Sequence, residues 1–224
     1  MLHADIWNGP VNIARDAGTY GYNDGDGWSG VLAGSAAHNV VVVDGQDQMR
    51  RLSRFLWAEW TRAQVLEAQA ATAQGASFSG VHFGYRRLGV DHRRTVYGRN
   101  GDWLVLDDLL FTKKRPHELA VHWHLDAGLQ WARDERGVHA GLADHSLSVD
   151  TLTEAQYEWY DRAEDLPCNG DSLYYGEITA GALFVVRANS EQSTRFVSCL
   201  GRERPRIAGG VATWHDLTVS MAPG

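Results

Sequence analysis

Cysteine is scarce in this chain, whose 224 residues include only Cys168 and Cys199. Two cysteines cannot form the several bridges on which small disulfide-rich domains depend, so that class of protein is excluded. A single bridge between them and two buried thiols are both compatible with the sequence, and buried thiols are the simpler interpretation. A hydrophobic core must therefore supply most of the stability.

Long apolar runs and a surplus of basic residues are also missing. No apolar stretch approaches the roughly 20 residues that a helix needs to cross a bilayer, and no signal peptide is visible. The formal net charge is −7, which argues against nucleic acid as a partner and opposes long-range attraction of acidic polysaccharides. A polyanion would therefore need a local basic patch.

Short strand-like segments separated by turn residues are abundant. Hydrophobic residues make up 44% of the chain, which suits one substantial β domain or two small ones, and we expect one domain over residues 1–224. Tight turns are predicted at Asp44-Gly45 and Asn100-Gly101, dipeptides that favour hairpins. The pattern predicts an all-β, antiparallel fold of stacked sheets. We expect strands at residues 6–8, 11–14, 39–43, 92–99, 103–111, 119–125, 129–133, 146–151, 156–160, 183–187, 195–200, 211–214 and 217–221.

Residues 18–34 interrupt this pattern with a stretch rich in Gly, Asp and Asn, which predicts a long loop. Its aromatic residues Tyr20, Tyr22 and Trp28 are the candidates for contact with a ligand. Aromatic rings can stack on sugar faces, although packing in the core is the simpler role for any single ring.

Three potential metal ligands, His3, Asp16 and His38, lie beside strand-like sequence near the start of the chain. Imidazole and carboxylate groups bind zinc without the help of thiolates. No two of the three have the i,i+4 spacing that would place them on one helix, so a site would have to form between strands or loops. With ten histidines in the chain, the residue types alone leave open whether these three bind a metal.

Several segments occur in a fixed order and at close spacing: HAD, RDAGTYGYN, AHNVVVVDGQDQ and RFLWAEW, followed by GYRRLGVDHRRTV and VHWHLD. Together they resemble the C-terminal domain of the heparinase II/III polysaccharide lyases, over most of residues 2–126. The resemblance implies a large two-layer β-sandwich that packs against an N-terminal α/α toroid. It also implies a strand within residues 55–74, where the composition favours a helix.

The resemblance further implies a metal site. His3, Asp16 and His38 match the residues that bind zinc in relatives, so zinc is the expected cofactor. Asn39 and Thr19 could support these ligands by hydrogen bonds. His122 and His124 share one strand face, and a structural role is expected for both because the resemblance places the zinc elsewhere.

The family cleaves uronate-containing polysaccharides by β-elimination, so an acidic polysaccharide is the expected partner. Its catalytic tyrosine and its carboxylate-neutralising asparagine or histidine come from the toroid. A further catalytic histidine stands two positions before His3, where this chain has Met1. We therefore expect a fragment with no catalytic residue of its own, inactive without the toroid. The parent protein is expected in the periplasm or outside the cell.

Substrate binding is predicted for Tyr20, Tyr22, Trp28 and Arg54. Arginine suits carboxylate and sulfate groups because its guanidinium binds them in a bidentate manner, although a solvated strand face is the simpler explanation for any one arginine.

Two alternatives to a lyase domain remain, a non-catalytic carbohydrate-binding module and a structural module that docks on a helical partner. The polysaccharide and the oligomeric state stay open. The two arginine clusters are Arg50, Arg51 and Arg54, and Arg86, Arg87, Arg93 and Arg94.

Overall fold

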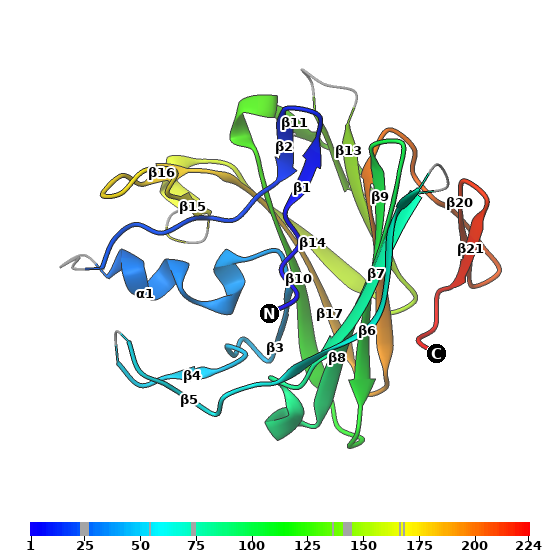
Figure 1. Cartoon of the computed structure of the whole chain (residues 1–224), viewed down its shortest axis with the longest axis horizontal. Coiled ribbons are helices and arrows are strands. Elements are labelled where there is room, and N and C mark those ends of the chain that lie inside the picture. The colour runs from blue at the N-terminus through cyan, green and yellow to red at the C-terminus, as the bar shows by residue number, and fades with distance from the viewer. Residues whose placement is uncertain are drawn as a thin grey trace.

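Two antiparallel sheets lie face to face and form the body of the molecule (Figure 1). The computed structural model describes residues 1–22, 27–53, 55–72, 75–135, 137–140, 145–165, 167 and 169–224. The smaller sheet has six strands in the order β1-β2-β10-β17-β14, with β3 also paired to β10. These strands are β1 (Ile6–Asn8), β2 (Val11–Ala14), β3 (Val41–Val43), β10 (His117–Leu125), β14 (Ala155–Tyr160) and β17 (Ala182–Ser190).

The larger sheet has eight strands in the order β11-β12-β13-β18-β9-β8-β7-β6. Its centre is the β8–β9 hairpin, whose turn at Asn100-Gly101 has both residues at positive φ, as a type I′ turn requires. The hairpin prediction is thus confirmed. The strands are β6 (Ala63–Thr72), β7 (Gly75–His82), β8 (Val90–Arg99), β9 (Asp102–Phe111), β11 (Trp131–Arg133), β12 (Gly137–Ala140), β13 (Ser146–Thr151) and β18 (Thr194–Gly201).

The main core lies between the two sheets. On β10 the alternate residues Leu119, Val121, Trp123 and Leu125 all point into it, as their spacing predicts, because successive side chains of a strand face opposite sides. The facing sheet contributes residues such as Leu109, which is fully buried. The all-β, antiparallel prediction is confirmed by this arrangement.

A third layer extends the predicted two-layer sandwich. The strands β19 (Arg206–Ala208), β20 (Val211–Trp214) and β21 (Leu217–Ser220) form a separate sheet. Trp214 and Met221 pack on Leu104 and Cys199 of the larger sheet, away from the main core. Burial raises the pKa of the Cys199 thiol to about 12. Cys168 lies outside the described residues, so a disulfide bridge between Cys168 and Cys199 and two separate thiols both stay compatible with the sequence.

Residues 55–72 contain strands and no helix, as the resemblance implies. β5 (Trp57–Ala58) pairs with β4 (Arg50–Arg51), and β6 pairs with β7 along nearly its whole length. Between β5 and β6, Glu59 has a φ of 59°, which interrupts the extended backbone. Pairing with β7 outweighs the helix propensity of this segment, because propensity contributes only tenths of a kcal/mol per residue, up to about 0.7.

The predicted loop over residues 18–34 contains a short helix, α1 (Trp28–Leu32), so the loop prediction was wrong for these five residues. Leu32 of the helix is buried against Ala17 and Ala37, and this small apolar cluster attaches α1 to the neighbouring segments. No helix among the described residues is long and apolar enough to cross a bilayer. The remaining helices are single 3-10 turns at Ser35–Ala37, Arg86–Leu88, Ala127–Leu129 and Ala163–Asp165.

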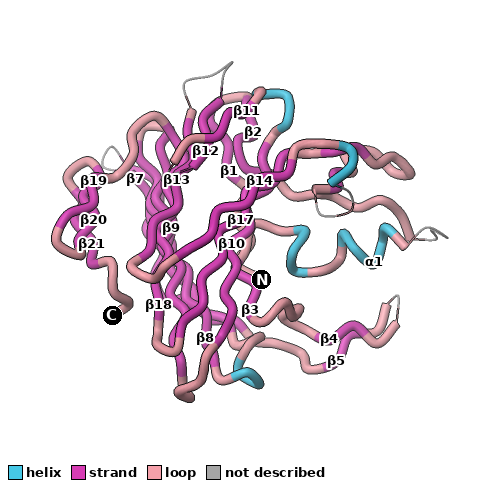
Figure 2. Tube along the Cα trace, turned by 180° about the vertical axis from the view of Figure 1, so that it is seen from behind, coloured by secondary structure: helices cyan, strands magenta, loops and turns pink. Residues whose placement is uncertain are grey.

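Figure 1 places α1, the β4–β5 pair and the β15–β16 pair (Gly170–Asp171 and Thr179–Ala180) on one side of the sandwich. The three-stranded sheet lies on the opposite side, and the view from behind agrees (Figure 2). In both views the N-terminus lies between α1 and the sandwich, close to β3. The smaller sheet therefore carries an outer layer of irregular segments, and this layer contains the candidate site.

One prediction concerns His122, which is buried on the outer face of β10. Burial lowers its pKa to about 3, from an ordinary value of 6.5. The unfolded chain therefore binds more protons than the folded chain below about pH 6.5, and the free energy of unfolding falls as the pH drops. At pH 5 this group is expected to remove about 2 kcal/mol.

Urea unfolding at pH 7 and pH 5 measures this loss. His122→Gln keeps a hydrogen-bond donor toward the Ala120 carbonyl, which the ring nitrogen Nδ1 contacts at 3.1 Å. The variant is expected to lose less stability than the wild type over the same pH interval. An equal loss of unfolding free energy in both proteins would show that His122 does not cause the pH dependence of stability.

Candidate functional site

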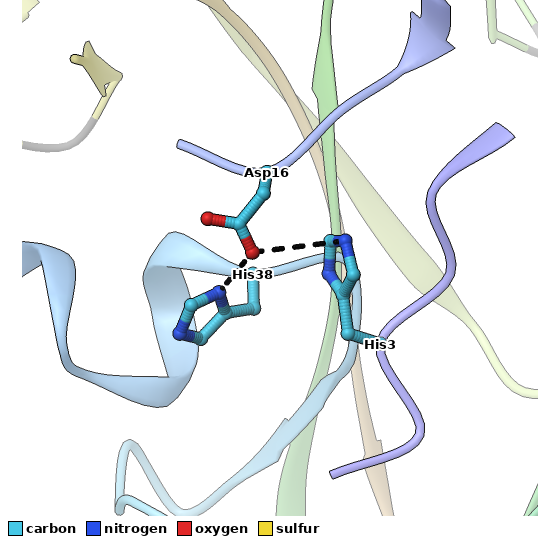
Figure 3. A group of neighbouring side chains, drawn as sticks. All are labelled: His3, Asp16 and His38. Atoms are coloured by element: carbon cyan, nitrogen blue, oxygen red, sulfur yellow. Dashed lines mark hydrogen bonds and ion pairs between the residues drawn. The ribbon is translucent and has the colours of Figure 1, made fainter. Parts of the chain in front are cut away.

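Three chain segments meet above the middle of β10. β3 pairs with the first half of β10, through Val41 and Val121, whereas β2 pairs with its last residue, through Ala14 and Leu125. Both segments leave the sheet in the gap between these pairings. Asp16 follows β2 and His38 precedes β3, so the two residues emerge side by side, and the segment before β1 brings His3 to the same place (Figure 3).

The three side chains converge on one carboxylate oxygen. His38 Nδ1 lies 2.7 Å from Asp16 Oδ2, and His3 Nε2 lies 3.7 Å from the same atom. One potential ligand atom from each residue falls within 4.8 Å of the other two. The structure therefore brings together the three residues that the sequence predicted as metal ligands, and their role as ligands stays a prediction.

The surroundings of the cluster favour an ionised Asp16 carboxylate and a neutral His3 ring. Burial alone would raise the pKa of Asp16, but the hydrogen bond and charge of His38 outweigh it and lower that pKa. Burial lowers the pKa of His3, which favours its neutral form. An ionised carboxylate beside a neutral imidazole is the protonation state that a zinc site requires.

The donor set fits zinc in type and arrangement. His3 Nε2 is buried and has no hydrogen-bond partner among the described residues, yet it points toward Asp16. A cation between them would satisfy this atom once its lone pair, and not a proton, faces Asp16. The Asn39 N–H donates to His3 Nδ1 at 3.0 Å, which places the proton of the neutral ring on Nε2. Binding at Nε2 therefore requires that this proton leave or that the ring reorient.

An open pocket of about 270 Å³ adjoins the cluster, and Asp16 and His38 form part of its wall. Arg51 of β4, Trp57 of β5 and Phe55 form another part of the wall. Most of the accessible lining is apolar, with Arg51 as its one cationic side chain. The lining residues are Asp16, Gly18, Thr19, Tyr20, Gly21, Tyr22, Ser29, Leu32, Ala33, His38, Arg51, Phe55 and Trp57.

The predicted substrate-binding residues divide into three groups. Tyr20 and Tyr22 line the pocket. Trp28 does not, because its ring packs against Gly170, where a Cβ atom would come within 2.9 Å of it. Arg54 lies outside the described residues. Substrate contact by all four stays a prediction, although Trp28 is badly placed for it from this pocket.

Sequence reasoning missed Phe55 and Trp57 as pocket residues and named Arg51 only as part of a basic cluster. Arg51 Nη1 donates to the Ser29 carbonyl at 3.3 Å, and its guanidinium lies 5.9 Å from the Trp57 ring centre. The signal for this wall was a group of three arginines followed by Phe55 and Trp57 within residues 50–57, which becomes meaningful only once the β4–β5 pairing is known.

The second arginine cluster is not a single basic patch. Arg86 pairs with Asp91 through two hydrogen bonds, and Arg93 pairs with Asp108. Arg94 is only 1% exposed. The solvated-face interpretation is therefore wrong for Arg94, which points into the protein because β8 alternates its side chains between two faces.

Solved structures of larger proteins contain a domain with this fold. Heparan sulfate lyase HepC from Pedobacter heparinus superimposes with a TM-score of 0.68 at 18% sequence identity, covering 95% of this chain and 35% of that one. A heparinase III structure gives 0.66 at 13% identity, covering 93% and 33%. At such identities the likeness concerns the fold, and this chain spans about a third of either relative. No curated protein sequence matches the chain.

A family model gives the assignment that fold similarity alone cannot give. The model described as heparinase II/III-like, C-terminal, matches residues 1–191, which is most of the 224-residue chain. The matched range includes the His3, Asp16 and His38 cluster, the pocket beside it and every strand of the two large sheets except β18, which begins at Thr194. This chain belongs to the heparinase II/III-like C-terminal domain family.

Proposed function

We propose that this domain is part of a polysaccharide lyase that cleaves uronate-containing polysaccharide by β-elimination, and that it holds one zinc ion. The observation that supports the proposal best is the convergence of His3, Asp16 and His38 beside an aromatic pocket. The domain fold of heparan sulfate lyase HepC and heparinase III is consistent with it. The parent protein would work where such polymers occur, in the periplasm or outside the cell.

The proposed zinc site has a structural role first. Bound zinc would supply a positive charge and cross-link the three segments that carry its ligands. The chain's own groups do the rest: Asp16 Oδ1 accepts the Gly18 N–H at 2.8 Å, which fixes one end of the carboxylate. Thr19, which was also predicted to support the site, lines the pocket beside Asp16 and His38, and its supporting role stays a prediction.

The pocket is proposed to hold a sugar unit of the polymer. Tyr20, Tyr22 and Trp57 offer ring faces, and Arg51 offers a guanidinium that suits a uronate carboxylate. Removal of the C5 proton needs a base and a group that neutralises the carboxylate. We propose that a helical domain of the parent protein supplies these groups, as the family resemblance implies.

The isolated chain is expected to bind uronate oligosaccharide without cleaving it. Absorbance of the unsaturated product, with heparin, heparan sulfate and alginate as substrates, measures cleavage, and calorimetry with matching oligosaccharides measures binding. Turnover at about 1 per second or faster would contradict the proposal that another domain supplies the catalytic groups.

Tyr20→Ala is expected to weaken oligosaccharide binding about tenfold, because the ring that would stack on the sugar is removed. Tyr97→Ala, which is remote from the pocket, serves as the control.

Exposed apolar side chains around the pocket support a second candidate, the docking module. Phe55 is 73% exposed and Tyr22 is 61% exposed, and both line the pocket. Neighbouring exposed apolar side chains of this kind mark surfaces that bind another molecule. A helical domain packed over them would also close the pocket. Absence of oligosaccharide binding by the isolated chain, together with binding after a helical domain is supplied, would favour this candidate over an independent carbohydrate-binding module.

A further inference from the structure

A buried ion pair lies directly behind the candidate metal centre. Arg94 of β8 and Asp107 of β9 are partners in the strand register, and both side chains are almost fully enclosed. Arg94 Nε lies 2.7 Å from Asp107 Oδ1, and Arg94 Nη2 lies 2.9 Å from Oδ2. This bidentate contact fixes the plane of the guanidinium and leaves its third nitrogen, Nη1, pointing away from the carboxylate.

The free end of the guanidinium holds two peptide carbonyls. Arg94 Nη1 donates to the Leu2 carbonyl at 2.8 Å and to the Asn39 carbonyl at 2.5 Å. Leu2 precedes His3, and Asn39 follows His38. One nitrogen atom therefore joins the two segments that bring both histidines of the cluster to the carboxylate.

Asn39 completes the connection to the third ligand. Its Nδ2 donates to the Ala4 carbonyl at 3.0 Å and to the Arg15 carbonyl at 3.1 Å. Its Oδ1 accepts the His124 N–H of β10 at 2.6 Å. Ala4 follows His3 and Arg15 precedes Asp16, so Asn39 and Arg94 together hold peptide groups adjacent to all three potential ligands.

Asp107 is itself held in place by two buried histidines. The Gly84 N–H donates to His82 Nδ1 at 3.1 Å, which leaves the proton of that ring on Nε2. His82 Nε2 then donates to His92 Nδ1 at 2.9 Å, and His92 Nε2 donates to Asp107 Oδ1 at 2.7 Å. Every donor in this series has an acceptor, so the position of Arg94 is fixed from the interior of the larger sheet.

We infer that Arg94 is a positioning residue, which sets the spacing of His3 and His38 through the carbonyl groups of Leu2 and Asn39. The inference rests on the proposed metal site for its function, but not for its geometry. Lysine could not replace Arg94 in this role, because one ammonium group cannot bind a carboxylate side-on and also reach two carbonyls beyond it.

Arg94→Lys tests the inference, because it keeps a positive charge beside Asp107. Arg93→Lys is the matched control: Arg93 pairs with Asp108 between the same two strands, on the opposite face. Zinc affinity is measured on the whole 224-residue chain by competition with a chelator, at a temperature where circular dichroism shows each variant folded. We expect Arg94→Lys to raise the Kd for zinc about 10- to 100-fold, and Arg93→Lys to change it less than about threefold.

A second measurement needs no metal. The Asn39 N–H donates to His3 Nδ1, so its hydrogen exchange in the metal-free protein reports how firmly the two segments are held together. We expect exchange at least about tenfold faster in Arg94→Lys than in the wild type, with no such change in Arg93→Lys.

These outcomes separate the inference from the proposed function. If the wild type binds no zinc, the proposed metal site fails, while the exchange of the Asn39 N–H still decides the role of Arg94. A folded Arg94→Lys protein with wild-type exchange and wild-type affinity would overturn the inference, and so would equal effects of the two lysine variants. If Arg94→Lys does not fold, the uncharged double variant Arg94→Met/Asp107→Asn takes its place, since neutral replacement of a buried ion pair is often tolerated.

Discussion

Zinc binding is expected to be lost when Asp16 is replaced by alanine. Asp16 Oδ2 is the atom shared by both histidine contacts, at 2.7 Å from His38 Nδ1 and 3.7 Å from His3 Nε2. Structural zinc sites bind with roughly 10–16 kcal/mol, so the loss of one of three protein ligands is expected to cost about 3 kcal/mol, or about 100-fold in affinity or more. The remaining pair of imidazoles would not retain zinc through purification.

Metal analysis of the purified protein and titration calorimetry measure this effect. Asp5→Ala is the control, because Asp5 is exposed, lies two residues from His3 and is not part of the cluster. Zinc at about 100 times its Kd should also stabilise the wild type by about 2.7 kcal/mol, and Asp16→Ala by almost nothing. Equal zinc content in the wild type and in Asp16→Ala would refute the assignment of His3, Asp16 and His38.

Asp107→Ala is expected to cause the largest loss of stability, about 3–5 kcal/mol. Asp107 has no solvent exposure, and it accepts hydrogen bonds from Arg94 and His92. Its removal leaves a guanidinium charge inside the protein without a counter-charge, and leaves the His92 N–H without an acceptor. Removal of the Asp107 carboxylate also removes the free-energy cost of burying it. We expect this gain to be smaller than the loss, because the charged Arg94 stays buried.

Urea unfolding followed by tryptophan fluorescence measures the change in free energy of unfolding. Asp216→Ala is the control, because Asp216 pairs with Arg99 at the surface and its side chain is 77% exposed. Surface pairs of this kind contribute about 0–1 kcal/mol. A loss below about 1 kcal/mol for Asp107→Ala would mean that the buried pair is not needed to hold the sheets together.

The strands were predictable because their signals are local. Period-two alternation over Leu119–Leu125 predicts a buried strand, and the Asn-Gly dipeptide at residues 100–101, between two strand-like segments, predicts a tight turn. The strand over Ala63–Thr72 required the family resemblance, because its residues favour a helix and only the pairing with β7 makes it extended. Segments decided by long-range pairing cannot be identified from propensity alone.

Parts of the site were beyond sequence reasoning for the same physical reason. The Asp44-Gly45 turn forms, with both residues at positive φ, yet β3 pairs with β10 and not with the strand that follows the turn. Arg94 stands in a row of charged residues that resembles an exposed strand, and its burial depends on Asp107 in the next strand. The pocket wall at Phe55 and Trp57 likewise depends on how β4 and β5 pair.

The hydrogen bond from Arg94 to the Leu2 carbonyl has a consequence for the order of folding. The two residues are 92 positions apart, and Asn39 and His124, also joined by a hydrogen bond, are 85 apart. Contacts between such distant positions carry a large entropic cost until the intervening strands are in place. The β8–β9 hairpin, by contrast, closes across two residues. We therefore expect the β8–β9 hairpin to form before the candidate metal cluster, so that a folding chain would hold His3 and His38 together only after the strand that carries Arg94 is in place.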